Sequence, residues 1–254
     1  MSNCYLAKLR TKLFDNLSKR QAFFEFLKSF RTVCYRLFLW LYWRNYVKNY
    51  MNKNAVRKLQ VGTGPNFLQG WINTDLIPTK NKLYMDASKK FPFEVATFDY
   101  IFSEHLLEHL SYDQGINFIR ECRRVLKPEG MIRIATPDLN FLIALYNEEK
   151  NDAQRQYIDW AVKASAKPHP SDDPVRAVFI INNFVRSWGH KFIYDYNSLA
   201  YILAQEGFRD ITKCNVGESA DSNLRALETH GKLIGDRFNK LESLVLEATR
   251  GNIG

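Results

Sequence analysis

Short apolar runs, separated by glycine, proline and polar residues, recur along the chain from residue 57 to residue 138. Runs over 57–61, 71–75, 82–85 and 98–102 have the length of buried strands, and a fifth covers Met131 to Asp138. Two more strands are predicted late in the chain, over 208–215 and 243–248. Polar residues follow most of these runs directly, which indicates that functional side chains gather at the strand ends.

Helical periodicity fills the spaces between the later strands. Ser111 opens a helix with Gln114 as its capping-box partner, and apolar residues recur at Ile116, Ile119 and Cys122. The turn over 127–130 ends this helix. A second helix is predicted over 197–206, with Gly207 as its C-cap. Strands that alternate with helices predict an α/β fold, a Rossmann-like and mostly parallel sheet with helices on its faces.

The N-terminal part has a different pattern. Apolar residues spaced by four and three from Phe23 to Leu41 form one stripe of a helix, and residues 33–43 are apolar nearly all round. This run is too short to span a bilayer, which needs roughly 20 apolar residues. We therefore divide the chain into an amphipathic helical arm over residues 1–55 and an α/β domain over residues 56–254.

Charge separates the same two parts. Residues 1–58 hold thirteen basic and two acidic residues, whereas the rest of the chain is nearly neutral. Aromatic rings flanked by Arg and Lys favour a helix lying in a membrane interface. Packing against the domain or a second subunit stays an alternative. Nucleic-acid binding is disfavoured because so much of the arm is apolar.

The cysteines indicate the compartment. Cys4, Cys34, Cys122 and Cys214 are scattered and lack C-x-x-C spacing, which argues against structural zinc and against a disulfide framework. No signal peptide is recognisable at the N-terminus. We expect a cytoplasmic protein, with the arm reaching the inner face of the membrane.

A glycine turn follows the first strand. Gly62, Thr63 and Gly64 allow close approach of a ligand because glycine has no Cβ and tolerates positive φ. Asp75 ends the second strand, where a carboxylate can accept hydrogen bonds from ribose hydroxyls. The segment therefore suggests a nucleoside-containing cofactor.

Spacing narrows the choice of cofactor. In the G-x-G-x-x-G pattern of dinucleotide folds the third glycine would stand at Phe67, and Asp75 comes too early for the usual acid. A phosphate-binding G-x-x-x-x-G-K-[ST] loop is absent here too. NAD and nucleoside triphosphates are therefore disfavoured.

One competing motif involves metal. His105, Glu108 and His109 match H-x-x-E-H, the inverted zinc-protease pattern, in which two histidines face one ion from a helix. No clear third ligand stands out in the sequence. We favour a site without metal, and a metal hydrolase stays the least favoured alternative.

Four segments together resemble class I S-adenosylmethionine-dependent methyltransferases, and within them a small bacterial branch associated with polysaccharide synthesis. They are VGTGPNFLQGWINTDL, FDYIFSEHLLEHL, ECRRVLKPEGMIRIATPDL and GHKFIYDYNSLAYILAQEGF, and the resemblance covers about residues 57–228. The resemblance implies a seven-stranded sheet with an antiparallel last strand and S-adenosyl-L-methionine as cofactor. Gln60-Val61 stand where many class I enzymes carry an acidic residue, and the connection between the first two strands is shortened.

The resemblance also implies roles for the strand-end residues. Gly62 and Gly64, with Thr63 between them, would line the methionine part of the cofactor. Asp75 would hold the ribose hydroxyls, whereas Asp86 and Ala87 would meet the adenine. The segment Ser103, Glu104 and His105 would lie beside the methionine carboxylate and the sulfonium.

His190 is the first candidate for a general base. It follows a long insert, expected to be irregular from about Ala166 to Asn182, of the kind that builds an acceptor pocket. A histidine suits proton removal from a hydroxyl near neutral pH. Asp138, after the fifth strand, is the other candidate base or a group that orients the base. Methyl transfer that relies on positioning alone is a third possibility.

The sequence therefore predicts a methyltransferase that O-methylates a sugar or a cell-surface glycan. Through residues 1–50 it would contact the membrane or a glycosyltransferase. The alternative is an inactive methyltransferase-fold scaffold that acts through its arm.

Overall fold

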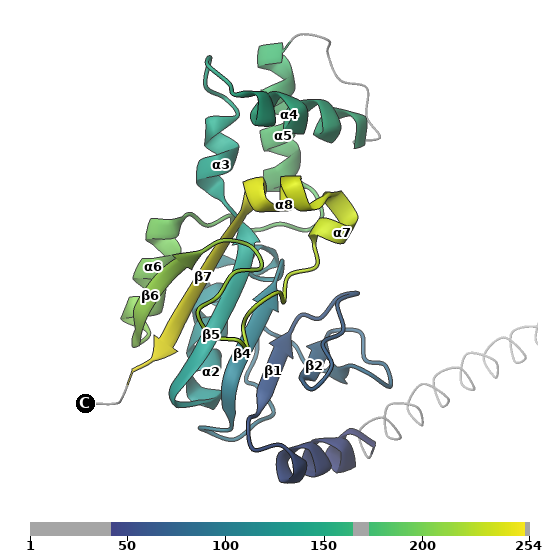
Figure 1. Ribbon diagram of the computed structural model, residues 1–254, viewed down its shortest axis with the longest axis vertical. Helices are drawn as coiled ribbons and strands as arrows, with labels where there is room; N and C mark the ends of the chain where they lie inside the picture. Colours follow the sequence, from purple (N-terminus) through teal and green to yellow (C-terminus); the bar gives the residue numbers. More distant parts are fainter. Residues whose placement is uncertain (1–41, 165–172, 252–254) are drawn as a thin grey trace, which may run out of the picture. The chain divides into compact units, whose positions relative to one another are not determined.

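A computed structural model of the chain describes residues 42–164 and 173–251 (Figure 1). Contacts group the chain into two units, residues 1–53 and 54–254. Of the first unit, a helix over 42–53 is described, in which the ring of Trp43 packs on those of Tyr42 and Tyr46. The predicted stripe from Phe23 to Leu41 lies outside the described residues, so both interpretations of the arm stay predictions. Across the described ranges, no helix has the length and apolar character to cross a bilayer.

Seven strands form the sheet of the second unit, in the order β3-β2-β1-β4-β5-β7-β6. Their bounds are β1 (Lys58–Val61), β2 (Ile72–Asp75), β3 (Leu83–Tyr84), β4 (Phe98–Glu104), β5 (Leu126–Pro137), β6 (Phe208–Cys214) and β7 (Ser243–Arg250). Neighbours from β3 to β5 run parallel, whereas β7 is antiparallel to both β5 and β6. This topology confirms the predicted Rossmann-like sheet with seven strands.

The helices are α2 (Tyr112–Val125), α3 (Leu139–Ala144), α4 (Asp152–Ala164), α5 (Asp173–Arg186), α6 (Tyr196–Gln205), α7 (Gly231–Ile234) and α8 (Asp236–Glu242), with a 3-10 turn η1 (Leu107–His109). The predicted capping box of α2 is present: Ser111 Oγ accepts from Gln114 N, and Gln114 Oε1 accepts from Ser111 N at 3.0 Å. Gly207 follows α6 with a φ of 81°, as a C-terminal glycine should.

The predicted turn over 127–130 needs correction. β5 begins directly after α2, because Leu126 already pairs with Phe98. The register then shifts between Phe98 and Tyr100, and Glu129 takes a φ of 65°. The residues expected to form a separate turn are therefore an irregular first part of the strand.

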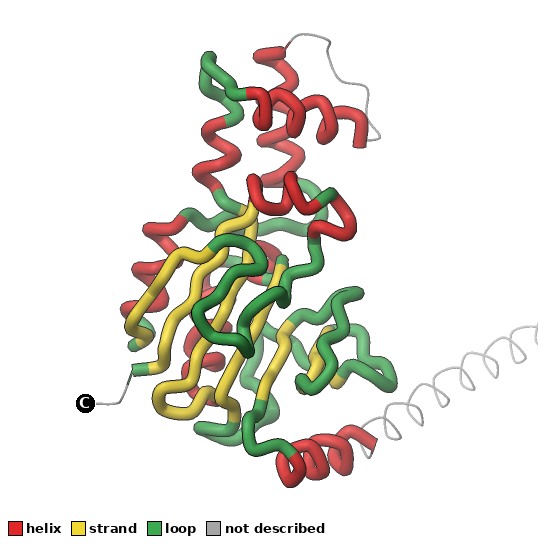
Figure 2. Tube along the Cα trace, viewed as in Figure 1, coloured by secondary structure: helices red, strands yellow, loops and turns green. Residues whose placement is uncertain are grey.

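The two faces of the sheet are covered differently. Helices α2 and α6 lie behind the sheet in Figure 1, and α2 buries Phe118 and Ile119 there. The connections 62–71, 76–82 and 85–97 are described throughout and contain no helix. A long loop over residues 215–230, here called the strap, crosses the front of the sheet instead (Figure 2).

Buried polar contacts fix the strap to the sheet. Arg133 of β5 is fully buried, and its guanidinium contacts Glu228 of the strap and Glu247 of β7 at 2.5 Å each. Tyr100 of β4 donates to Asp221 at 2.7 Å. Leu224 and Leu227 pack with Trp71 and Phe102 over the strands. The strap therefore covers this face of the sheet in place of a helix, and its last residue, His230, lies at the sheet edge.

Helices α3, α4, α5, α7 and α8 gather beyond the carboxyl end of β5 (Figure 1). The expectation of an irregular insert up to residue 182 is wrong for 173–182, which are part of α5. Ala177, Ile180 and Phe184 recur by three and four residues, and this stripe packs against Tyr157 and Ile158 of α4. Residues 165–172 lie outside the described part of the chain.

Candidate functional site

The glycine turn after β1 is held tightly by the chain itself. Gly62 and Gly64 have φ values of 71° and 52°. A Cβ added to Gly62 would lie 2.9 Å from Leu106. A Cβ added to Gly64 would have no neighbouring atom of the described residues within 4 Å. The N–H groups of Gly62 and Thr63 both donate to Thr74 O. The loop thus offers close approach at Gly64 rather than a row of free N–H donors.

Asp75 closes the same loop. Its Oδ2 accepts from Gly64 N at 2.8 Å, and its Oδ1 accepts from Ile77 N at 3.0 Å. Lys82 Nζ lies 3.5 Å from the carboxylate and donates to Gly64 O at 3.0 Å. The predicted ribose-binding carboxylate is therefore positioned at the edge of the sheet, next to a lysine that the sequence analysis did not single out.

Asp86 shapes the turn after β3. Its Oδ1 accepts from the Ser88 hydroxyl at 2.7 Å and from Ser88 N at 3.0 Å. The Ser88 hydroxyl bond is the largest cause that lowers the pKa of Asp86, and burial only partly opposes it. Ala87 is buried beside it. In this arrangement Asp86 fixes the backbone around Ala87.

Ser103 and Glu104 end β4, and their side chains differ in partners. Ser103 pairs with Val61, the residue before the glycine turn. Its hydroxyl is buried and has no partner within the described structure. Glu104 accepts from Thr229 N and His230 N at 2.8 Å each. Ser103 is free to meet a ligand, whereas Glu104 clamps the strap.

These observations fit a nucleoside-containing cofactor. An open Cα at Gly64, a carboxylate at Asp75 and an orphaned hydroxyl at Ser103 lie along one edge of parallel strands. Ligands of such sheets bind outside the carboxyl ends of the strands. The predicted cofactor residues thus share one edge.

A cavity of about 460 Å³ lies next to this edge. Four of the five histidines of the chain line it, which is more than scattered core histidines would give. They are His105, His109, His190 and His230. The cavity's walls are otherwise mainly aromatic and aliphatic, and include Tyr157, Trp160, Ile180, Phe184, Trp188 and Leu233.

His105 forms a buried pair with Glu108. The residue takes a φ of 46°, unusual for a side chain with a Cβ, and its Nδ1 lies 3.1 Å from Glu108 Oε1. Burial favours neutral imidazole, but the hydrogen bond and charge of Glu108 outweigh it and raise the pKa of His105. Burial also opposes ionisation of Glu108, yet His105 lowers the pKa of that carboxyl. The two residues therefore form a hydrogen-bonded carboxylate–imidazole pair.

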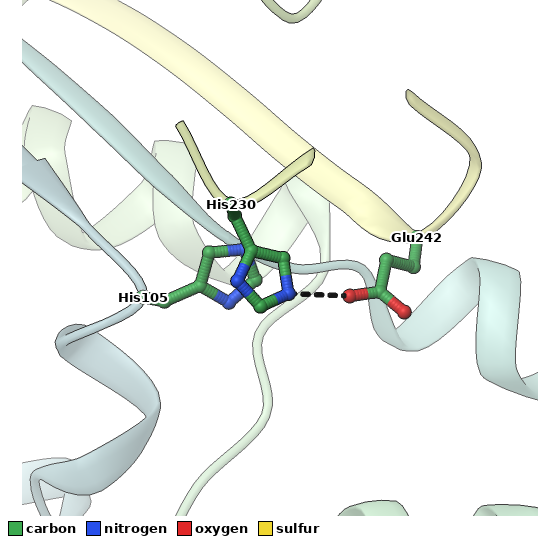
Figure 3. Close-up of side chains that lie close together, drawn as sticks. All are labelled: His105, His230 and Glu242. Carbon is green, nitrogen blue, oxygen red and sulfur yellow. Dashed lines mark hydrogen bonds and ion pairs between the residues drawn. The ribbon is translucent and has the colours of Figure 1, made fainter. Parts of the chain in front are cut away.

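His230 stacks on His105, with ring centroids 3.8 Å apart and planes inclined by 29° (Figure 3). Its Nε2 lies 3.2 Å from Glu242 Oε1. The other oxygen of Glu242 accepts from the Tyr157 hydroxyl at 2.5 Å. Burial is the main cause that raises the pKa of Tyr157 strongly, so this hydroxyl stays a donor. Two carboxylate–histidine pairs thus meet through their rings.

His190 lies across the cavity in the turn that follows α5. Its Nδ1 lies 2.6 Å from Phe184 O, and its ring is 4.9 Å from that of His109. Burial is the largest cause that lowers the pKa of His190. The structure therefore places His190 in the wall of the cavity.

Asp138 has other partners. It is the N-cap of α3, where its Oδ1 accepts from Asn140 N at 3.0 Å, and Lys213 Nζ lies 3.4 Å from its Oδ2. It is not among the described residues that line the cavity. The structure thus brings His190 and His105 together and leaves Asp138 outside.

Two sets of three side chains have the composition of metal ligands: His105, His230 and Glu242, and Glu108, His109 and His190. The H-x-x-E-H interpretation needed His105 and His109 on one helix, and this is wrong. His105 precedes the 3-10 turn that contains His109, and the two histidines fall into different sets.

His230, Glu242 and Tyr157 were not predicted from the sequence. They come from the strap, α8 and α4, so no local motif joins them. The available signal was limited to composition: the chain has five histidines, of which His105 and His109 follow a predicted strand.

Residues 59–134, from β1 into β5, match the family model described as a methyltransferase domain. The protein is an S-adenosylmethionine-dependent methyltransferase. The predicted enzyme class and cofactor are thereby confirmed. A methyltransferase acts on a methyl acceptor.

Solved structures with a similar fold include a SAM dependent methyltransferase from Archaeoglobus fulgidus, 18% identical, with a TM-score of 0.48; the match covers 82% of this chain and 90% of that one. A phosphoethanolamine N-methyltransferase 2 of Haemonchus contortus is 15% identical, with a TM-score of 0.42 over 79% of this chain and 50% of its own length. A methyltransferase of Mesorhizobium loti is 15% identical, with a TM-score of 0.44 over 77% of this chain and 91% of its own. No curated protein sequence matches the chain significantly.

Proposed function

We propose that this methyltransferase O-methylates a hydroxyl of a sugar or cell-surface glycan. The observation that carries the proposal is the cavity next to the cofactor edge, which combines aromatic walls with four histidines. Aromatic rings suit the apolar faces of a sugar ring, and imidazoles can exchange hydrogen bonds and protons with its hydroxyls.

The charges of the cavity favour a neutral acceptor. Among the described residues that line it there is no Lys or Arg, whereas Glu108 and Glu242 are both buried in its wall. A phosphorylated acceptor would need cationic partners there. A hydroxyl of a neutral saccharide makes no such demand.

The cofactor is proposed to lie along the strand ends. In this proposal Gly62, Thr63 and Gly64 border its methionine part, and Asp75 binds the ribose. Ala87, held by the Asp86 turn, meets the adenine, and Ser103 supplies the hydroxyl that has no protein partner. Glu104 acts indirectly by holding the strap.

For the proton of the acceptor hydroxyl, the cavity offers two candidate bases: His190, which was predicted from the sequence, and His105. Asp138 suits the role less, because its carboxylate is bound to Asn140 and Lys213.

The arm is proposed to bring the enzyme to the inner membrane face or to a glycosyltransferase. Its eleven basic residues and its apolar run support this. The alternative of an inactive scaffold is less favoured, since an open acceptor cavity adjoins the cofactor edge.

Calorimetric titration with S-adenosylhomocysteine, followed by transfer assays, tests the proposal. We expect saturable binding by the wild type, and methyl transfer to neutral saccharides rather than to amines or phosphorylated alcohols. Trp160→Ala should raise KM for the saccharide and leave S-adenosylhomocysteine affinity unchanged. Transfer to amines alone would refute the glycan assignment, and no binding would favour the scaffold.

A further inference from the structure

His105 stands where the cofactor edge and the acceptor cavity meet. It follows β4 directly, and Leu106 after it packs against the Cα of Gly62 in the glycine turn. Its own side chain lines the cavity. Of the four cavity histidines, it is the one that belongs to the predicted cofactor segment as well.

The hydrogen bonds of His105 settle which nitrogen is basic. Glu108 is fully buried and ionised, so Nδ1–H donates to its Oε1. The nearest group to Nε2 is Ser243 Oγ at 3.4 Å. That hydroxyl has one proton, which goes to Asn239 Oδ1 at the shorter distance of 2.7 Å. In the neutral ring, Nε2 therefore carries an uncommitted lone pair.

Glu108 is in turn oriented by other groups. Its Oε2 accepts from Thr136 Oγ1 of β5 at 3.1 Å, and its backbone carbonyl accepts from Lys191 N at 2.7 Å. Thr136 thus fixes the carboxylate and Lys191 fixes the backbone of Glu108, so the residue can hold the imidazole ring in one orientation.

We propose that His105 is the general base of the methyl transfer, and that Glu108 is the positioning residue that orients its ring and balances its charge. This inference rests on the proposed function and names the group that takes the acceptor proton. His190 then contributes to binding of the acceptor.

When bound, S-adenosylmethionine supplies the methyl group: the acceptor oxygen forms the C–O bond as the C–S bond breaks, and the bonding electron pair stays on sulfur. Nε2 of His105 takes the proton that the hydroxyl loses. The imidazolium so formed is stabilised by the carboxylate of Glu108 through the Nδ1–H bond. The proton passes to water once the product has left.

Several charged or titratable groups face His105. They are Glu104 on its own strand, Glu108 of η1, His230 at the end of the strap, His190 after α5 and Glu242 of α8. Burial lowers the pKa of the ring, but the three carboxylates, with Glu108 foremost, raise it overall. His190 has the opposite shift, because burial lowers its pKa. The two candidate bases therefore predict different pH dependences.

A pH profile of kcat at saturating cofactor and acceptor tests the assignment. With His105 as base, kcat should rise with pH through a pKa above the ordinary histidine value of about 6.5. His105→Gln should lower kcat by roughly 10² to 10⁴ and remove this limb. Glu108→Gln should lower the plateau by about tenfold or more and move the limb to lower pH. Glu206→Gln, in a pair with Arg120 away from the cavity, is the matched control.

A second readout needs neither cofactor nor acceptor. In proton NMR titrations, the His105 resonance, assigned with His105→Gln, should titrate above about 6.5 and move down in Glu108→Gln. A limb below that value that His190→Gln removes would assign the base to His190. An unchanged His105 titration in Glu108→Gln would also overturn the inference. Failure of the proposed function looks different: the wild type would bind S-adenosylhomocysteine and methylate no saccharide, while the NMR result stands by itself.

Discussion

The cofactor edge and the histidine cavity are neighbours, yet they are built in different ways. The edge is made of backbone turns: the glycine loop, the Asp75 carboxylate that ties it, and the Ser88–Asp86 turn. Each of these contacts joins residues close in sequence. The cavity is made of side chains from η1, α4, the strap and α8, joined over long separations.

The difference explains how one fold can keep its cofactor and change its acceptor. Short-range turns form the cofactor edge whatever the surrounding helices are. The cavity depends on elements that are added beyond the sheet, and above all on the strap that brings in His230. Function at the edge and function in the cavity should therefore respond separately to substitution.

The strap offers the strongest test of this separation. Arg133→Met leaves the buried carboxylates of Glu228 and Glu247 without their cation, which should lower the free energy of unfolding by about 3–5 kcal/mol. Urea denaturation measures this loss. Arg120→Met removes a matched Arg–Glu pair at the surface and should cost less than about 1 kcal/mol.

At temperatures where Arg133→Met remains folded, we expect kcat to fall while the Kd for S-adenosylhomocysteine stays near that of the wild type. Equal losses of kcat and of S-adenosylhomocysteine affinity would mean that the cofactor edge and the cavity form one cooperative unit. That result would contradict the proposed separation of the two regions.

Substitution of Asp75 tests the cofactor edge, because it should weaken cofactor binding and leave kcat nearly unchanged. Asp75→Ala removes the acceptor of Gly64 N and the predicted ribose partner, and should weaken S-adenosylhomocysteine binding by about 10- to 100-fold. Asp75→Asn keeps one acceptor oxygen, so its affinity for S-adenosylhomocysteine should lie between those of the wild type and Asp75→Ala. Calorimetry gives both affinities. The kcat of either variant at saturating cofactor should stay close to that of the wild type, since the cavity is untouched; a collapse of kcat with intact affinity would argue against the ribose assignment.

The smallest expected effect concerns metal. Dialysis against a chelator should leave methyl transfer unchanged, because His105 and His230 are stacked and each is paired with its own carboxylate. Activity assays before and after dialysis, with elemental analysis of the purified protein, measure this. Stoichiometric zinc whose removal abolishes activity would show that the histidines serve a metal instead.

Much of the fold was predictable because it depends on local patterns. The strands show apolar runs of the right length, and the pair Ser111 and Gln114 predicts the start of α2. The helix within the insert was not predicted. The stripe of Ala177, Ile180 and Phe184 is buried because it packs against Tyr157 of α4, and the local sequence does not reveal this long-range contact. Pairing with a distant helix decided its structure.

The residues of the site also divide into those that the local sequence predicts and those that only long-range contacts bring together. Strand-end residues from Gly62 to His105 could be named, since the carboxyl edge of a parallel sheet is a known location. The partnership of His230 with Glu242, and of Glu242 with Tyr157, could not. Glu108 was noted in the sequence only as part of H-x-x-E-H, whereas the structure buries it beside His105.

The position of β7 has a consequence for how the protein is made. β7 is synthesised after β6 but lies between β5 and β6 and pairs with both. While the ribosome is still translating the strap, β6 has no strand edge to join, and Arg133 waits for Glu247. The nascent chain can thus form its parallel half early, but the sheet closes only when β7 has left the exit tunnel. A chaperone that shields the free edge of β5 during that interval would have a defined target.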